Sequence, residues 1–365
     1  MKKIQGFEKG MGIGGWLTNY KRFNVLPKDK WFDITIGDME HFESYITERD
    51  VINIKKMGMD HIRLGFDQIV LEEAPFKYRT RIFELISNFV CWCEKHGLNV
   101  VLNLHKAIGN YCDIEESETL FDSEVLWDRF VALWLEIERW FSNKSLVMFE
   151  LLNEVRDIDP NMWNRLAEKT INAIREKNKE RKIIIGSTEW NTPWKLDKLQ
   201  IFDDENVIYT FHMYAPGEFT HQRGVLHWKE LYYNRTLTYP CDDIEKYREY
   251  NRLLFNNNNS YEKFSKMDIE FIGEFLKPVF DFTREHPDKI LWCGEFGTIR
   301  HADINSRENY MRDIISLLKE HDIPYCVWNY LSTPNDGNRF SLVDDDTRKI
   351  LSKRMLKIIQ GKKVK

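Results

Sequence analysis

The chain has 365 residues, of which 42% are hydrophobic and 14% aromatic, so it can bury a large core and is not globally disordered. Its formal net charge of −5, with no cluster of basic residues, argues against a nucleic-acid partner. No segment approaches the apolar length of a transmembrane helix, so we expect no membrane partner.

The amino-terminus and the cysteines are ordinary. Met1 and two lysines are followed by Gln5 and Glu8, where a signal peptide would carry its apolar core. We therefore expect a cytoplasmic location, unless a leader has been removed. The six cysteines show no metal or redox spacing, and we interpret them as reduced, structural thiols.

Strand-like and helix-like segments alternate along the chain. Short apolar runs predict strands over 11–16, 61–66, 99–105, 146–154, 182–187, 206–214, 289–296 and 324–330. Helical periodicity predicts helices over 46–57, 79–96, 123–141, from 159 onward, and over 269–286, 306–321 and 346–359. Gly58 and Gly97 are expected at helix C-termini, Ser123 at an N-cap, and Pro160 in a first turn.

This alternation of eight strands with helices predicts an α/β fold, a (β/α)8 TIM barrel that spans 1–365 as one domain. A doubly wound open sheet is the alternative, but Gly12, Gly14 and Gly15 lack the third glycine and the acidic partner of a dinucleotide-binding turn. Residues 216–268, after the sixth strand, are too long for an ordinary connection and predict a helical insertion or a lid.

Polar side chains recur at one end of the predicted strands. They are Arg63, His105, Asn153, Glu154, His212, Tyr214, Glu295 and Trp328. A lone histidine after an apolar strand is usually a structural group. Catalytic groups of barrels, however, gather at the C-terminal ends of the strands, and the full set is harder to explain by structure alone.

Glu154 and Glu295 come from different strands and suit acid–base work on an acetal bond. The leaving oxygen needs a proton while the forming oxocarbenium ion needs an anion or a nucleophile, so one glutamate must be protonated and the other ionised. Arg63 and Tyr214 could donate hydrogen bonds to Glu295 and hold it ionised.

Two local questions remain open at this level. Strict alternation would send Asn153 and Glu154 to opposite faces, so both serve one site only if the strand bulges or ends there. A buried arginine–glutamate network is the structural alternative for these carboxylates, and we interpret Glu150 with Arg63 as such a network.

Five motifs resemble those of glycoside hydrolase family five, the cellulase family. They are Leu151-Leu152-Asn153-Glu154, Cys293-Gly294-Glu295-Phe296-Gly297, Phe211-His212-Met213-Tyr214, Leu104-His105 and Val327-Trp328-Asn329. The resemblance runs from Gly14-Gly15-Trp16 to the last strand. Within the family it is nearest to the clostridial endoglucanases of the CelC type, whose insertion is similar at Thr220-His221-Gln222, Asn234-Arg235-Thr236 and Tyr239-Pro240.

The resemblance implies a retaining hydrolase in which Glu154 is the acid/base and Glu295 the nucleophile. It also implies a supporting shell around the two glutamates, formed by Arg63, His105, Asn153, His212 and Tyr214. Trp328 would be the platform on which the sugar at the cleaved unit stacks. Val155 stands where the family often has proline, which concerns the local turn rather than the chemistry. Further stacking candidates, for each of which packing is an equal explanation, are Trp16, Trp190, Tyr111 and Phe219.

The implied substrate is β-1,4-glucan or mixed-linkage β-1,3-1,4-glucan, attacked by an endo-acting monomer that uses no cofactor and no metal. A β-mannanase, a xyloglucan hydrolase, an exo-acting β-glucosidase and a non-catalytic β-glucan-binding protein remain alternatives on the same barrel. A barrel metallohydrolase could use His105 and His212, but the sequence lacks a paired His-x-His on one strand.

Overall fold

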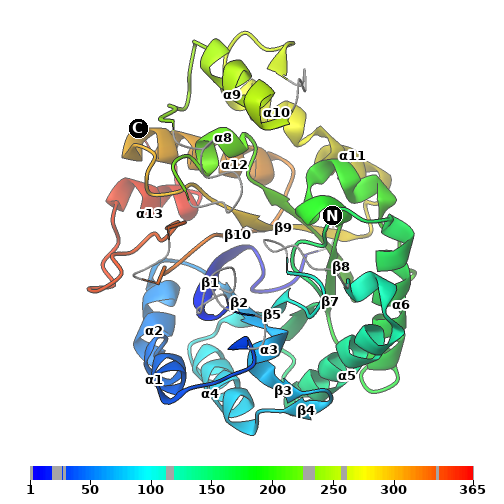
Figure 1. The fold of residues 1–365 in the computed structure, drawn as a ribbon. Coiled ribbons are helices and arrows are strands. Elements are labelled where there is room, and N and C mark those ends of the chain that lie inside the picture. Colours follow the sequence, from blue (N-terminus) through cyan, green and yellow to red (C-terminus); the bar gives the residue numbers. More distant parts are fainter. Residues whose placement is uncertain are drawn as a thin grey trace.

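In the computed structural model, eight parallel strands close into a barrel surrounded by helices (Figure 1). The structure describes residues 3–18, 27, 30–111, 119–224, 235–255, 261–333 and 337–364, with backbone alone at 250 and 253–255. The barrel strands are β1 (Lys9–Leu17), β2 (His61–Asp67), β5 (Asn99–Lys106), β6 (Val147–Glu150), β7 (Ile183–Gly186), β8 (Val207–Met213), β9 (Ile290–Phe296) and β10 (Tyr325–Val327). Each pairs with the next, and β10 pairs with β1, so the predicted (β/α)8 barrel is confirmed.

The barrel strands are apolar because helices cover their outer faces and side chains fill the interior. Every residue of β2, β6, β7, β8 and β9 is buried. Along one face of a strand, an apolar residue low in the barrel is followed by a polar residue nearer the C-terminal end. Val101 precedes Asn103 in this way, and Met148 precedes Glu150. The interior is therefore sealed below and polar at its C-terminal end.

The helices predicted from the periodicity of the sequence are present, together with others that the periodicity does not predict. They are α1 (Ile36–Ser44), α2 (Glu48–Lys56), α3 (Gln68–Leu71), α4 (Thr80–Lys95), α5 (Glu124–Phe141), α6 (Pro160–Arg175), α7 (Thr188–Asn191), α8 (Gly217–Thr220), α9 (Glu245–Phe255), α10 (Ile269–Phe275), α11 (Lys277–Glu285), α12 (Ile304–Glu320) and α13 (Lys353–Ile359). A hairpin of β3 (Glu72–Ala74) and β4 (Lys77–Tyr78) and the 3-10 turns η3 (Leu120–Asp122) and η4 (Pro193–Lys198) complete the described elements.

The helix termini follow the predicted chemistry. Gly58 and Gly97 have φ values of 88° and 65° at the ends of α2 and α4, where a residue with a side chain would be strained. Ser123 accepts a hydrogen bond from the backbone of Leu126 and caps α5. Asp159 caps α6, with Pro160 in its first turn.

Several predicted boundaries are wrong: the strand predicted over 324–330 ends at Val327, and three other differences have a clear cause. The segment predicted as a strand over 146–154 ends at Glu150, because the chain turns there toward the site. The helix predicted over 269–286 is two helices, since Pro278 has no backbone N–H to continue α10 and instead lies in the first turn of α11. The last helix is predicted to start at 346 but starts at Lys353, because Ser352 is its N-cap.

Part of the stretch 216–268 lies outside the barrel wall, where α9 stands at the periphery; α10 follows the stretch and begins at Ile269 (Figure 1). A buried carboxylate ties its parts together: Glu218 accepts hydrogen bonds from Asn251 at 2.9 Å and from Tyr261 at 2.8 Å. The asparagine run at 256–259 and Asn234 lie outside the described residues. The bounds of the insertion as a separate subdomain remain a prediction.

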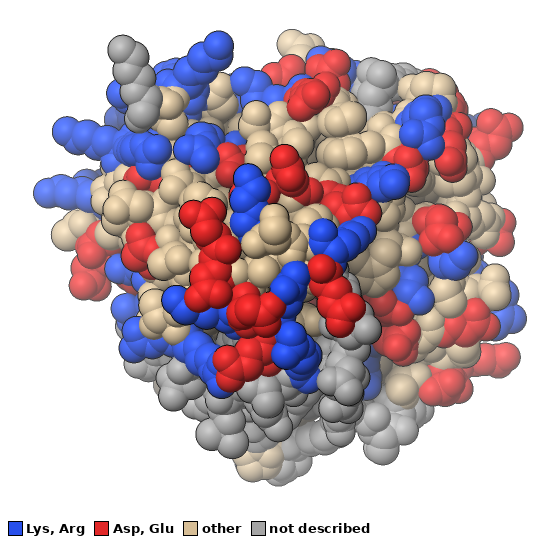
Figure 2. Space-filling model, turned by 90° about the horizontal axis from the view of Figure 1, so that it is seen from above, with Lys and Arg blue, Asp and Glu red and all other residues tan. Residues whose placement is uncertain are grey.

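The side of the molecule that carries α9 and α10 has a mixed surface. Figure 2 looks onto the face at the top of Figure 1, and lysine and arginine side chains alternate there with aspartate and glutamate side chains. In the part of the chain that the structure describes, no helix has both the length and the apolar character needed to cross a bilayer.

Candidate active site

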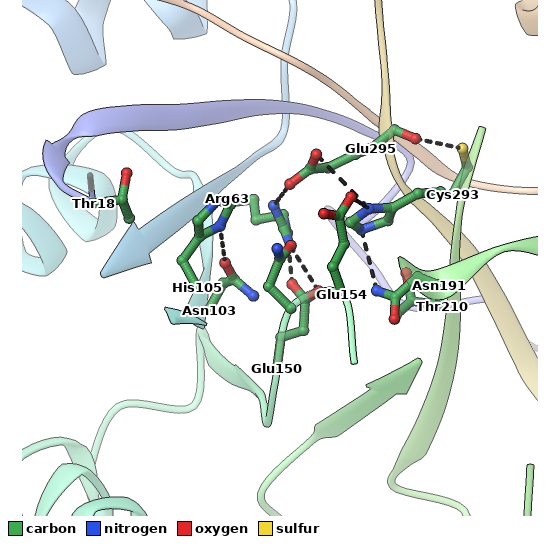
Figure 3. Close-up of polar contacts among 12 residues, drawn as sticks. Thr18, Arg63, Asn103, His105, Glu150, Glu154, Asn191, Thr210, Cys293 and Glu295 are labelled. Carbon is green, nitrogen blue, oxygen red and sulfur yellow. Dashed lines mark hydrogen bonds and ion pairs between the residues drawn. The ribbon is translucent and has the colours of Figure 1, made fainter. Parts of the chain in front are cut away.

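Two carboxylates, from strands separated by β7 and β8, meet at the C-terminal end of the barrel (Figure 3). Glu154 follows β6, and Glu295 is the second-to-last residue of β9. One oxygen of each carboxylate and one ring nitrogen of His212 lie within 4.8 Å of one another. The chain reaches this geometry because β6 has already ended and Glu154 adopts a left-handed φ of 45°, which allows Asn153 and Glu154 to serve the same site.

Arg63 lies beneath this pair and is fully buried. Its Nε donates to Oε2 of Glu150 at 2.6 Å and its Nη2 to Oε1 of Glu150 at 2.8 Å, a bidentate ion pair. The same guanidinium donates from Nη2 to Oδ1 of Asn153 at 2.7 Å and from Nη1 to Oε1 of Glu295. The predicted Arg63–Glu150 network is therefore confirmed, and it extends to Glu295.

Glu295 has a second fixed donor, because the Tyr214 hydroxyl donates to its Oε2 at 2.9 Å. Burial raises the pKa of Glu295, while Arg63 and Tyr214 favour its charged form and oppose that rise. Burial and the neighbouring Glu295 raise the pKa of Tyr214 well above its usual value, so this hydroxyl keeps its proton and remains a donor.

His212, on β8, lies between the two carboxylates. Its Nδ1 is 2.9 Å from Oε1 of Glu154 and 3.8 Å from Oε2 of Glu295. Burial lowers the pKa of His212 to about 4, so the imidazole is neutral near pH 7.

The rings of Trp328 and His105 stack with their centroids 5.6 Å apart and their planes at 7°. Nδ1 of His105 lies 3.0 Å from Oδ1 of Asn103, and burial lowers the pKa of this imidazole well below its usual value. A Cβ added at Gly12 or Gly14 would lie 2.6 Å from the Trp328 indole, so the glycines of β1 leave room for this ring.

The remaining stacking candidates separate by exposure. Trp16 is only 1% exposed and its Nε1 donates to the carbonyl of Phe42 at 2.7 Å, so the prediction that it stacks on substrate is wrong. Tyr111 and Phe219 are also buried, and the same correction applies. Trp16 contacts Phe89 of α4, Phe219 contacts Tyr310 of α12, and Tyr111 contacts Trp31. Trp190 is 44% exposed, and its backbone N–H donates to Val155 at 2.8 Å, so it lies beside the Glu154 segment and stays a candidate.

One site residue was missed at the sequence level. Nδ2 of Asn191 lies 3.3 Å from Nε2 of His212, and the asparagine is fully buried. It follows β7 through a turn in which Glu189, Trp190 and Asn191 all have positive φ values. A residue that reaches the site through such a turn carries no strand periodicity, and only its proximity to the end of a predicted strand pointed toward it.

Glu154, His212 and Glu295 are also close enough together to hold a cation. Arg63 and Tyr214, however, already direct positive charge and a hydroxyl proton at the two oxygens of Glu295. Of the two histidines in the metal hypothesis, His212 belongs to this group and His105 does not. The geometry therefore suits acid–base and nucleophilic chemistry better than metal binding.

A family model described as cellulase (glycosyl hydrolase family 5) matches residues 25–333. The chain is 35% identical to Endoglucanase C of Acetivibrio thermocellus, with 98% of this chain and 99% of that protein covered. It is 28% identical to Cellodextrinase A of Ruminococcus flavefaciens over 88% of this chain and 85% of that protein. Among solved structures, Cel5A of Thermotoga maritima in complex with cellobiose superimposes with a TM-score of 0.69 at 24% identity, covering 97% of both chains.

Proposed function

The chain belongs to glycosyl hydrolase family 5, and we propose that it is a retaining endo-β-glucanase acting on β-1,4-glucan or mixed-linkage β-1,3-1,4-glucan. The observation that carries the mechanism is the approach of the Glu154 and Glu295 carboxylates to within 4.8 Å. Retaining glycosidases hold their carboxyl groups about 5–5.5 Å apart, whereas inverting enzymes leave about 6.5–9.5 Å for a water molecule. The close pair supports double displacement.

In the first step, the Glu295 carboxylate attacks the anomeric carbon while the glycosidic C–O bond breaks. Glu154 gives its proton to the departing oxygen, so the leaving sugar departs as a neutral alcohol. In the second step, water attacks the same carbon and Glu154 takes up its proton. The ester bond to Glu295 then breaks and regenerates the carboxylate.

The surroundings of the two glutamates support this assignment of roles. Glu295 accepts from the Arg63 guanidinium and the Tyr214 hydroxyl, both of which favour the ionised form that a nucleophile needs. Glu150 neutralises Arg63, so the trio of Arg63, Glu150 and Glu295 keeps one net negative charge for the reaction. Glu154 has a neutral imidazole beside it and is better suited to exchange a proton.

The sugar next to the cleaved bond has identifiable partners. Oδ1 of Asn153 accepts from Arg63, while its Nδ2 is buried without a hydrogen-bond partner among the described residues. A buried donor of this kind costs about 1–3 kcal/mol when it stays unpaired, so a substrate hydroxyl beside the reacting carbon is its natural acceptor. Trp328 offers a flat, partly exposed ring for stacking on the same sugar.

The choice of β-glucan rests on Endoglucanase C, which resembles this chain over nearly the full length of both proteins. The likeness to Cellodextrinase A favours a second candidate function, the hydrolysis of short soluble cello-oligosaccharides. The same site would perform this reaction by the same mechanism. Product profiles on defined β-glucan oligosaccharides, carboxymethylcellulose and lichenan separate these substrates. Internal cleavage supports the first candidate, and release of short units from chain ends supports the second.

The mechanism is tested by the anomer that appears first. Proton NMR of cellopentaose hydrolysis should show the β-anomer as the initial product, and an initial α-anomer would contradict a retaining mechanism. Glu295→Gln and Glu154→Gln should each abolish most hydrolysis of cellopentaose. Glu94→Gln, which changes an exposed carboxylate on α4, is the matched control and should retain full activity.

With Glu295→Gly, added azide should yield a glycosyl azide of inverted configuration, since azide then takes the place of the nucleophile. With Glu154→Gly, rescue should yield the azide with retained configuration. The reverse pattern would exchange the two roles.

A further inference from the structure

Both ring nitrogens of His212 have a side-chain partner. On one side, Nδ1 is 2.9 Å from Oε1 of Glu154. On the other side, Nε2 is 3.3 Å from Nδ2 of Asn191. An amide nitrogen can only donate, so Nε2 is the acceptor and the single proton of the neutral ring lies on Nδ1, directed at Glu154.

The Asn191–His212 pair occupies space that two neighbouring strands leave open. A Cβ added at Gly186 on β7 would lie 2.4 Å from the Asn191 amide. A Cβ added at Gly294 on β9 would lie 2.5 Å from Oγ1 of Thr210 and 3.3 Å from Nε2 of His212. Real side chains do not approach so closely, so glycine on both sides is what admits the amide against the ring.

The charged groups facing His212 come from three sides. Glu154 and Glu150 approach from β6 and the segment that follows it, Glu295 from β9, and Arg63 from β2. Burial keeps the pKa of His212 at about 4, and the opposing effects of Glu295 and Arg63 do not reverse this. Across the neutral pH range the ring is therefore uncharged. The effect of His212 on Glu154 then depends on which ring nitrogen carries the proton, because Nδ1 either donates a hydrogen bond to Glu154 or accepts one from it.

We propose that Asn191 is a positioning residue that holds His212 in the tautomer with its proton on Nδ1, and that this tautomer stabilises Glu154 whenever its carboxylate is ionised. The proposal rests on the proposed role of Glu154 as acid/base. Glu154 is ionised after it has protonated the leaving oxygen and before it takes a proton from water. The opposite tautomer would present a lone pair to Glu154 and would stabilise only its protonated form.

Two substitutions test this, because both glycine and aspartate tolerate the φ of 58° at Asn191. Asn191→Gly removes the donor, so both tautomers become accessible and protonated Glu154 gains a hydrogen bond to Nδ1. The basic limb of the pH profile of kcat/KM should then move to higher pH. The kcat/KM for cellotetraose, whose leaving group needs the proton, should fall about fivefold to tenfold, the worth of one hydrogen bond.

The kcat/KM for 2,4-dinitrophenyl β-cellobioside should stay within about twofold, because this leaving group departs without protonation. If Asn191 had only a structural role, Asn191→Gly would lower kcat/KM for both substrates by the same factor and leave the pH profile unchanged. Asn164→Gly, which changes a partly buried asparagine on α6 whose side chain hydrogen-bonds the backbone of Lys198 and Gln200, provides the control for the loss of a hydrogen-bonded asparagine side chain.

The tautomer itself is read by long-range nitrogen–proton NMR on protein labelled with [15N]histidine, with the His212 signals assigned from their loss in His212→Gln. The wild-type protein should show Nδ1 protonated and Nε2 bare at pH 7. Asn191→Asp, which accepts instead of donating, should show Nε2 protonated. A bare Nδ1 in the wild type, or an unchanged Nε2 in Asn191→Asp, would overturn the proposal. This readout needs no turnover, so it stands or falls independently of the proposed function.

Discussion

Removing the Tyr214 hydroxyl is the sharpest probe of how Glu295 is kept ionised. In Tyr214→Phe the ring remains, but Oε2 of Glu295 loses a donor at 2.9 Å. A hydrogen bond to a charged group contributes about 1.5–3 kcal/mol. Since about 1.36 kcal/mol corresponds to one pH unit, the pKa of Glu295 should rise by about one to two units. Burial already raises this pKa, so the change adds to an existing shift.

The assay is the pH dependence of kcat/KM, whose acidic limb reports ionisation of the nucleophile in the free enzyme. Losing a donor disfavours the carboxylate, so the limb must move to higher pH, with little loss on the alkaline side of the limb. Tyr239→Phe is the matched control, because its hydroxyl donates at 3.0 Å to Asp313, another buried carboxylate. The reasoning is refuted if the acidic limb of Tyr214→Phe stays in place, or if the control moves it equally.

Three further outcomes are expected. Trp328→Ala should raise KM for cello-oligosaccharides at least tenfold, with little effect on the free energy of unfolding. Trp16→Ala removes a buried ring, so it should lower the free energy of unfolding by about 3–5 kcal/mol and leave the KM of the folded protein unchanged. Steady-state kinetics measures the first effect and denaturant unfolding the second. His212 binds its proton more weakly in the folded state than in the unfolded chain, so it should reduce stability as pH falls from about 6.5 to about 4, by roughly 3 kcal/mol in total; that slope should flatten in His212→Gln, and an equally steep slope in the variant would contradict it. Hydrolysis of carboxymethylcellulose should survive dialysis against EDTA, and loss of activity that Zn²⁺ or Mg²⁺ restores would favour a metal at Glu154, His212 and Glu295 instead.

The barrel and its polar rim follow from patterns that depend on the chain alone. Apolar runs at regular intervals predict buried parallel strands, and polar residues at their ends predict a shared site, because parallel strands bring their C-terminal ends together. His212 and Glu295 reach the site in this way, whereas Arg63 is the third residue of β2, not its end, and reaches the site with its long side chain. Asn191 does not, because its position depends on left-handed turn residues that no periodicity describes.

The two tryptophans Trp16 and Trp328 show a different limit. Each comes near the C-terminal end of an apolar strand, so pattern alone gives them equal standing. What separates them is the surface against which each packs: Gly12 and Gly14 leave space beside β1, and the Trp328 ring from the neighbouring β10 segment fills it. Trp16 itself turns outward against Phe89. Where each of these two rings packs cannot be predicted until it is known which strands pair with each other.

The strongest argument for unequal roles of the two glutamates is the rigidity of their partners. Glu295 is held by donors fixed elsewhere: Arg63 forms a bidentate pair with Glu150, and burial raises the pKa of Tyr214 well above its usual value, so its hydroxyl remains a donor. Such preorganised donors stabilise one charge state, as a nucleophile requires. Among its described hydrogen-bond partners, Glu154 has a neutral imidazole, which carries no positive charge to oppose protonation of the carboxylate. The proposed acid/base must give up and regain a proton in each turnover, and a neutral partner hinders that exchange less than the Arg63 guanidinium, which faces Glu295, would.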